Sequence, residues 1–164
     1  MRAVRSDKKV SIEARLLPSV DAHVCEIVYV CQIPRKDVGE YLVRAVLYDR
    51  DLIDNLRHKF RFNFEFDDEF VLFGNPERSK YKKPRSANRE LYTRIPQELH
   101  DRLELFAHAM GGASIAATTG FLVTKAFETQ RIVAELLRRH PPTDVHRRER
   151  ARTLWNRLFP RAAY

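Results

Sequence analysis

The feature that most constrains this chain is an internal repeat, in which residues 10–48 resemble residues 89–128. Each copy opens with an alternating apolar segment, meets a proline, and continues with two segments of helical periodicity. A strand and two helices of this size cannot bury their apolar surface alone, so the two copies must share one core. The second helical segments match at these pairs: Gly39 and Gly120, Leu42 and Val123, Arg44 and Lys125, Ala45 and Ala126.

Each copy begins with a short predicted strand. Apolar and polar residues alternate in both, and a period of two places them on opposite faces of a strand. The inward set is Val10, Ile12, Ala14 and Leu16 in one copy and Leu91, Thr93 and Ile95 in the other. The outward set is Ser11, Glu13 and Arg15, and then Glu90, Tyr92 and Arg94. Because a lone strand leaves its backbone groups unpaired, we predict that the two strands pair antiparallel above a shared core of four helices.

Two helices are predicted in each copy after the proline that meets the strand, Pro18 or Pro96. Breaks at Ile33-Pro34 and Gly111-Gly112 separate the first helices from the second ones. Pro34 suits a first helical position and Ser114 an N-cap. The first helices have apolar residues at the spacings of one helix face: Val20, Val24, Ile27, Val28 and Cys31, and then Leu99, Leu103, Phe106, Ala107 and Met110.

The remaining segments lie between and after the copies. Residues 59–66 alternate strictly, and with the apolar run Phe70–Phe73 they predict two strands around the acidic turn Asp67–Glu69. Residues 74–88, rich in Pro, Lys and Arg, are typical of a solvated basic linker. Thr143-Asp144 is a predicted cap for a last helix, whose apolar side is Val145, Ala151, Leu154, Trp155 and Leu158.

These elements predict a mainly α fold with a small antiparallel β-ribbon, a β insert and a C-terminal helix. The expected organisation is a flexible basic start at 1–8, a first unit at 9–57, a β-hairpin insert with a basic linker at 58–88, a second unit at 89–140, and a basic C-terminal helix at 141–164.

The net charge of the chain limits the classes of molecule that it is expected to bind. The 164 residues carry a net charge of +8, which attracts polyanions such as nucleic acid or an anionic membrane surface. No apolar run is long enough to span a membrane, and the first residues lack the apolar core of a secretory signal. We therefore expect a cytoplasmic protein that does not bind membranes.

Few residues in the sequence suggest catalysis, redox activity or metal binding. Cys25 and Cys31 fit no zinc or redox spacing and are predicted to be buried free thiols. Residues 67–69 could hold a hard cation, but an exposed turn is the favoured interpretation. The histidines show no ligand spacing, and no nucleotide-binding, metalloprotease or nucleophile-elbow motif occurs. We expect no enzyme activity, no cofactor and no metal site.

The second copy resembles the ribbon-helix-helix superfamily of Arc and MetJ type. The resemblance rests on residues 94–103, with Ile95, Pro96, Leu99 and Leu103, followed by Ala107, Gly111 or Gly112, Ser114 and Ala126. The first copy departs from the pattern, since Pro18 lies one residue late and Ile33-Pro34 replaces the glycine turn. Two copies in one chain are similar to single-chain members that act as DNA-transfer accessory proteins of conjugative and tumour-inducing plasmids. The resemblance implies a tandem ribbon-helix-helix pseudo-dimer.

The resemblance also implies a function, because ribbons of this family enter the major groove of double-stranded DNA and read base edges. The implied base-reading residues are Ser11, Glu13, Arg15, Glu90, Tyr92 and Arg94. Arg15 and Arg94 occupy equivalent positions and could each bind guanine, whereas solvated ion pairs across the strands are the alternative for the charged residues. The implied phosphate-binding residues are Lys9, Arg35, Lys36 and Ser114.

The expected role is transcription regulation, for example as a repressor, by a monomer that acts as a pseudo-dimer. An accessory role in plasmid transfer, replication or partition is an alternative, as is association of copies side by side on DNA. A further alternative is an antitoxin-like module that binds a protein partner through the C-terminal helix. Packing of that helix on its own core, with its arginines solvated or on phosphates, is the competing interpretation.

Overall fold

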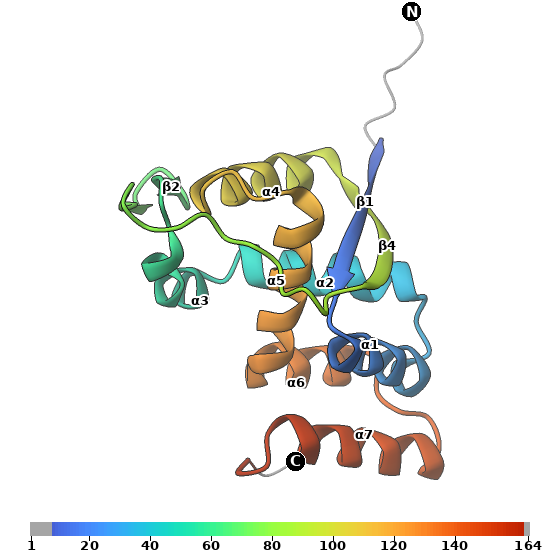
Figure 1. The fold of residues 1–164 in the computed structure, drawn as a ribbon. Coiled ribbons are helices and arrows are strands. Elements are labelled where there is room, and N and C mark those ends of the chain that lie inside the picture. The colour runs from blue at the N-terminus through green and yellow to red at the C-terminus, as the bar shows by residue number, and fades with distance from the viewer. Residues whose placement is uncertain (1–7, 163–164) are drawn as a thin grey trace, which may run out of the picture.

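The computed structural model describes residues 8–162, so most of the predicted basic start lies outside the described residues. The fold is mainly helical with a small antiparallel two-stranded sheet, as predicted (Figure 1). Its elements are β1 (Lys9–Leu16), α1 (Pro18–Cys31), α2 (Arg35–Leu47), α3 (Arg50–Asn55), the 3-10 turn η1 (Arg57–Lys59), β2 (Phe64–Glu65), β3 (Val71–Leu72), β4 (Arg89–Pro96), α4 (Gln97–Ala109), α5 (Ile115–Glu128), α6 (Gln130–Arg139) and α7 (Val145–Leu158).

The predicted pairing of the two strands is confirmed. β1 and β4 are antiparallel, with Glu13 opposite Tyr92 at the centre of the ladder. Six of the seven inward residues are buried, and Val10 at the end of the ribbon is half-buried. Thr93, the one polar member, donates its hydroxyl hydrogen bond to the Lys36 carbonyl, which removes the cost of burying it.

The second helix of each copy lies under the strand of the other copy. α5 packs on β1, α2 packs on β4, and the two helices also contact each other. Glycines permit the close approach, because a Cβ at Gly120 would lie 2.0 Å from the Arg15 carbonyl oxygen and one at Gly39 would lie 3.0 Å from Thr93 Cβ. The matched glycines of the repeat therefore mark matched contacts with the ribbon.

The helix ends follow local backbone chemistry. Gly111 and Gly112 adopt positive φ angles of 95° and 78° after α4. In the first copy Gln32 takes the left-handed position after α1, with φ of 55°, and so replaces the glycine. Ser114 caps α5 as predicted, since its hydroxyl accepts from the Ala117 amide at 3.1 Å. Pro34 is the N-cap of α2 and not its first helical residue.

The insert between the copies is less regular than its alternation predicts. β2 and β3 pair over two residues each, and Lys59 belongs to η1 and not to a strand. Phe60 and Phe64 are fully buried and pack edge-on against Phe106 of α4. The alternating phenylalanines thus anchor the hairpin to the core, and this packing takes the place of a longer ladder.

The basic linker is only partly solvated, which corrects the prediction for residues 74–88. Ala87 is buried, and the Tyr81 ring contacts the Phe121 ring of α5 edge to face. The Tyr81 amide also donates to the Met110 carbonyl at 3.0 Å. These contacts hold the linker across α5. Arg78 is half-buried and donates to the Arg57 and Phe60 carbonyls, whereas Lys80, Lys82, Lys83 and Arg85 are exposed.

The C-terminal segment packs on its own chain. α6 and α3 are third helices of the two copies, and the sequence pattern did not separate them from the preceding helices. α7 packs on α1, with Ala151, Leu154 and Trp155 buried and Asp144 as its N-cap. Val145 is 65% exposed, contrary to the prediction, because the first turn of α7 lies beyond the apolar contact.

Candidate nucleic-acid interface

The polar face of the ribbon points away from the helices. The cross-strand pairs that contain its six outward residues are Ser11 with Arg94, Glu13 with Tyr92, and Arg15 with Glu90. All six are exposed or half-buried, and Tyr92 is 61% exposed. The sequence alternation therefore placed these side chains on one common face, as expected.

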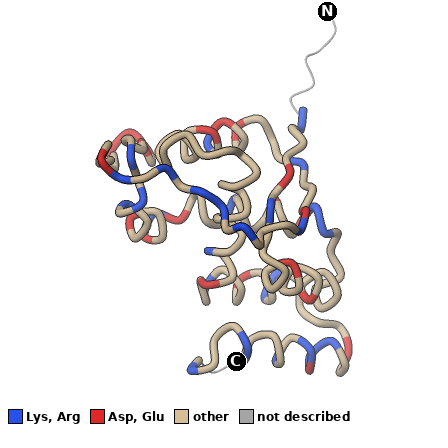
Figure 2. The backbone as a smooth tube through the Cα atoms, in the orientation of Figure 1, with Lys and Arg blue, Asp and Glu red and all other residues tan. Residues whose placement is uncertain are grey.

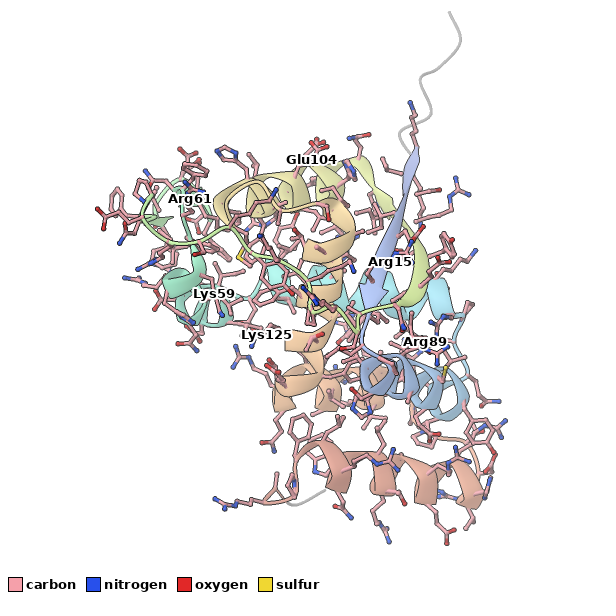
Figure 3. The ribbon with its side chains drawn as sticks, viewed as in Figure 1. Arg15, Lys59, Arg61, Arg89, Glu104 and Lys125 are labelled. Carbon is pink, nitrogen blue, oxygen red and sulfur yellow. The ribbon has the colours of Figure 1, made fainter. Side chains whose placement is uncertain are left out.

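Ion pairs organise one half of this face. The Arg15 guanidinium, labelled in Figure 3, lies 2.7 Å from a Glu13 oxygen and 2.9 Å from a Glu90 oxygen. The Tyr92 hydroxyl donates to the second Glu90 oxygen at 2.8 Å, and this bond and the nearby carboxylates raise the pKa of Tyr92. These ion pairs are the alternative that the sequence left open for the charged residues. Arg15 must leave both carboxylates before it can bind a base.

The other half of the face, at Ser11 and Arg94, has no ion pair among the described residues. Arg94 is exposed, and within residues 8–162 it makes no hydrogen bond or ion pair. A guanidinium in this state can approach a base edge without breaking an existing contact. With two carboxylates and two guanidiniums, the six outward residues together carry no net charge.

The predicted phosphate-binding residues lie in different environments. Lys9 pairs with Glu40 at 3.4 Å, and Arg35 pairs with Asp21 and donates to the Glu90 carbonyl at 3.0 Å. Ser114 is exposed, but its hydroxyl is engaged in capping α5. Lys36 is exposed and makes no side-chain contact in the described part of the chain.

Sequence reasoning did not include the basic linker in the site. Lys80, Lys82, Lys83 and Arg85 are exposed, and the linker leads directly into Arg89 at the start of β4. Figure 2 shows this band of basic residues running across the molecule to one end of the ribbon. Tyr81, Pro84 and Ala87 line a small cavity together with Arg15 and Leu17, so the linker passes beside the end of β1. The charge run was the available signal, but only the tertiary packing shows where it lies.

The two thiols and the acidic turn lie in different environments. Cys31 is buried and its pKa is raised by burial to about 11, whereas Cys25 is exposed beside Arg35, contrary to the prediction that both are buried. Cys25 lies on the side of α1 that faces away from the core. Residues 67–69 form the expected exposed turn, in which Asp67 accepts from the Glu69 amide at 2.9 Å.

One group of possible metal ligands occurs in the described residues, at His100, Asp101 and Glu104 on α4. His100 lies 3.7 Å from Glu104, and Asp101 accepts from Gln97 at 2.7 Å. These are contacts between neighbouring turns of one helix, and they explain the grouping without an ion.

Comparison of the chain with protein-family models, curated proteins and solved structures gave no match. None of the helices in the described part has the length and apolar character needed to cross a membrane. The class of function therefore rests on the geometry of the ribbon and its surroundings.

Proposed function

We propose that this chain binds double-stranded DNA in a sequence-specific manner, with the β1–β4 ribbon in the major groove. The observation that supports this most is the exposed polar face of an isolated two-stranded ribbon, whose inner face is covered by helices. A ribbon of this size fits the width of the major groove, where each base pair presents a distinct donor and acceptor pattern. The side chains on the face include donors and acceptors for base edges.

We propose further that the two copies form a ribbon-helix-helix pseudo-dimer. Glu13 and Tyr92, which are equivalent in the repeat, lie opposite each other at the centre of the ladder. Gly39 and Gly120 are also equivalent, and each lies under the strand of the other copy. Both observations agree with an approximate twofold axis through the middle of the ribbon.

The basic linker supplies a second kind of contact in this proposal. Its exposed lysines and arginine lie beside one end of the ribbon, where the phosphate backbone that borders the groove would pass. Contacts to phosphate carry affinity and salt dependence but little sequence information. The linker is therefore assigned to affinity and the ribbon to specificity.

The experiment that tests the proposal compares Arg94→Ala with Lys82→Ala in DNA titrations. Each variant is titrated with a selected site and with an unrelated duplex of equal length, at several salt concentrations. Arg94→Ala is expected to lose about 1–3 kcal/mol on the selected site only. Lys82→Ala should weaken both duplexes alike and reduce the salt slope by about 1. If both variants lose affinity equally on both duplexes, the ribbon does not read bases.

Fusion of the copies makes the face asymmetric, since one strand presents Ser11, Glu13 and Arg15 and the other Glu90, Tyr92 and Arg94. We therefore expect a preferred site that departs from a perfect palindrome, in contrast to the operators of symmetric dimers. Selection of bound duplexes from a random pool tests this, and recovery of perfect inverted repeats alone would contradict it.

The position of the selected site then assigns the biological role. A site that overlaps a promoter supports the proposed transcriptional regulator, and one within a plasmid transfer or replication origin supports an accessory protein. An antitoxin-like role would need a C-terminal segment available to a partner, and α7 instead packs on α1.

A further inference from the structure

A groove between α6 and α7 has no part in the proposed DNA contact. Its volume is about 550 Å³, within the range of pockets that bind ligands. The apolar lining consists of Ala134, Leu137, Pro141, Pro142 and Trp155, and the charged lining of Arg138, Arg148 and Arg152. Among residues 8–162 no acidic side chain lines it, so the groove combines apolar surface with positive charge.

Within the described residues, no ion pair neutralises the two arginines that α7 contributes to the groove. Arg148 and Arg152 are one helical turn apart, an arrangement in which like charges repel. Arg148 donates to the Asp144 carbonyl at 3.3 Å, and Arg152 makes no hydrogen bond or ion pair in the described part of the chain. Arg138 on the opposite wall is already paired with Glu135. An occupant that is both acidic and apolar would relieve the repulsion and cover the apolar lining.

The chain itself has a segment of this composition in the β2–β3 hairpin. Its turn carries Asp67, Asp68 and Glu69, all exposed, and no salt bridge within residues 8–162 involves them. Just after the turn, Val71 is 38% exposed and Phe73 is 77% exposed. Val71 lies on β3 and Phe73 directly follows its end, and Leu72 between them is buried, so the two exposed side chains lie on the side away from the core.

We propose that the hairpin turn of one molecule docks in the α6–α7 groove of a second copy, with the carboxylates of residues 67–69 on Arg148 and Arg152 and the exposed face of β3 against the apolar lining. The hairpin and α7 lie at well separated ends of the molecule in Figure 1, so one copy cannot make this contact with itself. An interface between two different surfaces propagates from copy to copy, and so forms an open row of molecules unless the rotation between copies closes it into a ring.

This arrangement leaves the ribbon accessible. α1 lies between the ribbon and α7, and the hairpin projects from the opposite side of the molecule (Figure 1). The inference does not rest on DNA binding, since the interface uses none of the ribbon residues. If DNA binding also holds, the row provides neighbouring copies along one duplex.

Complementation between two variants tests the interface. The groove variant carries Arg148→Glu and Arg152→Glu, and the hairpin variant carries Asp67→Lys and Asp68→Lys. Sedimentation velocity at low salt should show concentration-dependent association of the original chain, weakened about tenfold or more in each variant alone. A mixture of the variants should associate again, because the unaltered hairpin of one fits the unaltered groove of the other and the two reversed surfaces also carry opposite charges.

Two controls fix the interpretation. Arg157→Glu reverses a single charge on α7 outside the groove and should associate like the original chain. Circular dichroism of every variant should match that of the original chain. A mixture that fails to pair, or an original chain that stays monomeric at all concentrations, would overturn the proposal. So would a groove variant that associates normally but loses affinity for DNA, which would assign the groove to phosphate.

Discussion

Adding one methyl group at Gly120 tests how closely α5 and the ribbon are packed. In Gly120→Ala the new Cβ would lie 2.0 Å from the Arg15 carbonyl oxygen, far inside contact distance. The obstacle is backbone, and the carbonyl belongs to the paired strand β1, so either the helix or the ribbon must move. Overpacking of this kind costs about 1–3 kcal/mol and more where backbone shifts.

The helix itself opposes this loss, since alanine is favoured over glycine within a helix by roughly 0.5–1 kcal/mol. We therefore expect a net fall of about 2 kcal/mol in the free energy of unfolding, which corresponds to roughly 4–8 °C in Tm for a chain of this size. Urea titration followed by circular dichroism measures the first quantity and calorimetry the second.

Gly39→Ala is the matched comparison at the equivalent position. Its Cβ would meet the Thr93 side chain at 3.0 Å and no backbone atom at closer range, so a small shift accommodates it. We expect this variant to lie within roughly 1 kcal/mol of the original chain. If Gly120→Ala is as stable as the original chain, or if Gly39→Ala is the more damaging of the two, the described contact between α5 and β1 is wrong.

Three further changes follow from single contacts. Arg102→Met leaves two backbone carbonyls, each 2.9 Å from the guanidinium, without their donor, and urea titration should show a loss of about 2–3 kcal/mol. A disulfide reagent at about pH 8 should modify Cys25 in the folded protein but Cys31 only after denaturation, and equal rates would contradict the burial that raises the Cys31 pKa to about 11. Burial alone would raise the pKa of Asp49, but its hydrogen bonds, with Arg131 the largest, lower it below the usual 3.8. Because the pKa of Asp49 is lower in the folded state, its carboxylate stabilises the fold above the unfolded-state pKa, and this stabilisation is lost as the pH falls through the folded-state pKa. Asp49→Asn should therefore flatten the acid side of the stability profile, and an unchanged acid limb would contradict this.

The sequence was most informative where a pattern repeats. Alternation in two matched segments predicted the inward and outward residues of the ribbon, and the need to pair a lone strand predicted that they lie together. The caps at Ser114 and Asp144 were also predictable, because both depend on a few neighbouring residues. Within the site, the six outward residues occupy the expected face.

What the sequence did not predict depends on contacts between distant segments. The strict alternation of residues 59–66 favours a long strand, but packing of Phe60 and Phe64 on Phe106 leaves only a short ladder. The many charges of the linker predicted a solvated segment, but two of its residues, Tyr81 and Ala87, anchor it to the core. Pairing of Arg15 with Glu90 across the ladder depends on strand register, which periodicity alone does not give.

In the proposed DNA complex, the arrangement of charge would separate affinity from specificity. The six outward residues of the ribbon are electrically balanced, whereas exposed cations lie beside them at Lys9, at Lys36 and on the linker. Phosphate contacts by these cations would set the salt dependence, and hydrogen bonds from the ribbon would set the sequence preference. Arg15 must give up Glu13 and Glu90 to bind a base, but Arg94 has no such partner to lose. We therefore expect the half of the selected DNA site that Arg94 contacts to be the better defined one. Equal definition of both halves would mean that Arg15 exchanges its carboxylates for a base at no net cost.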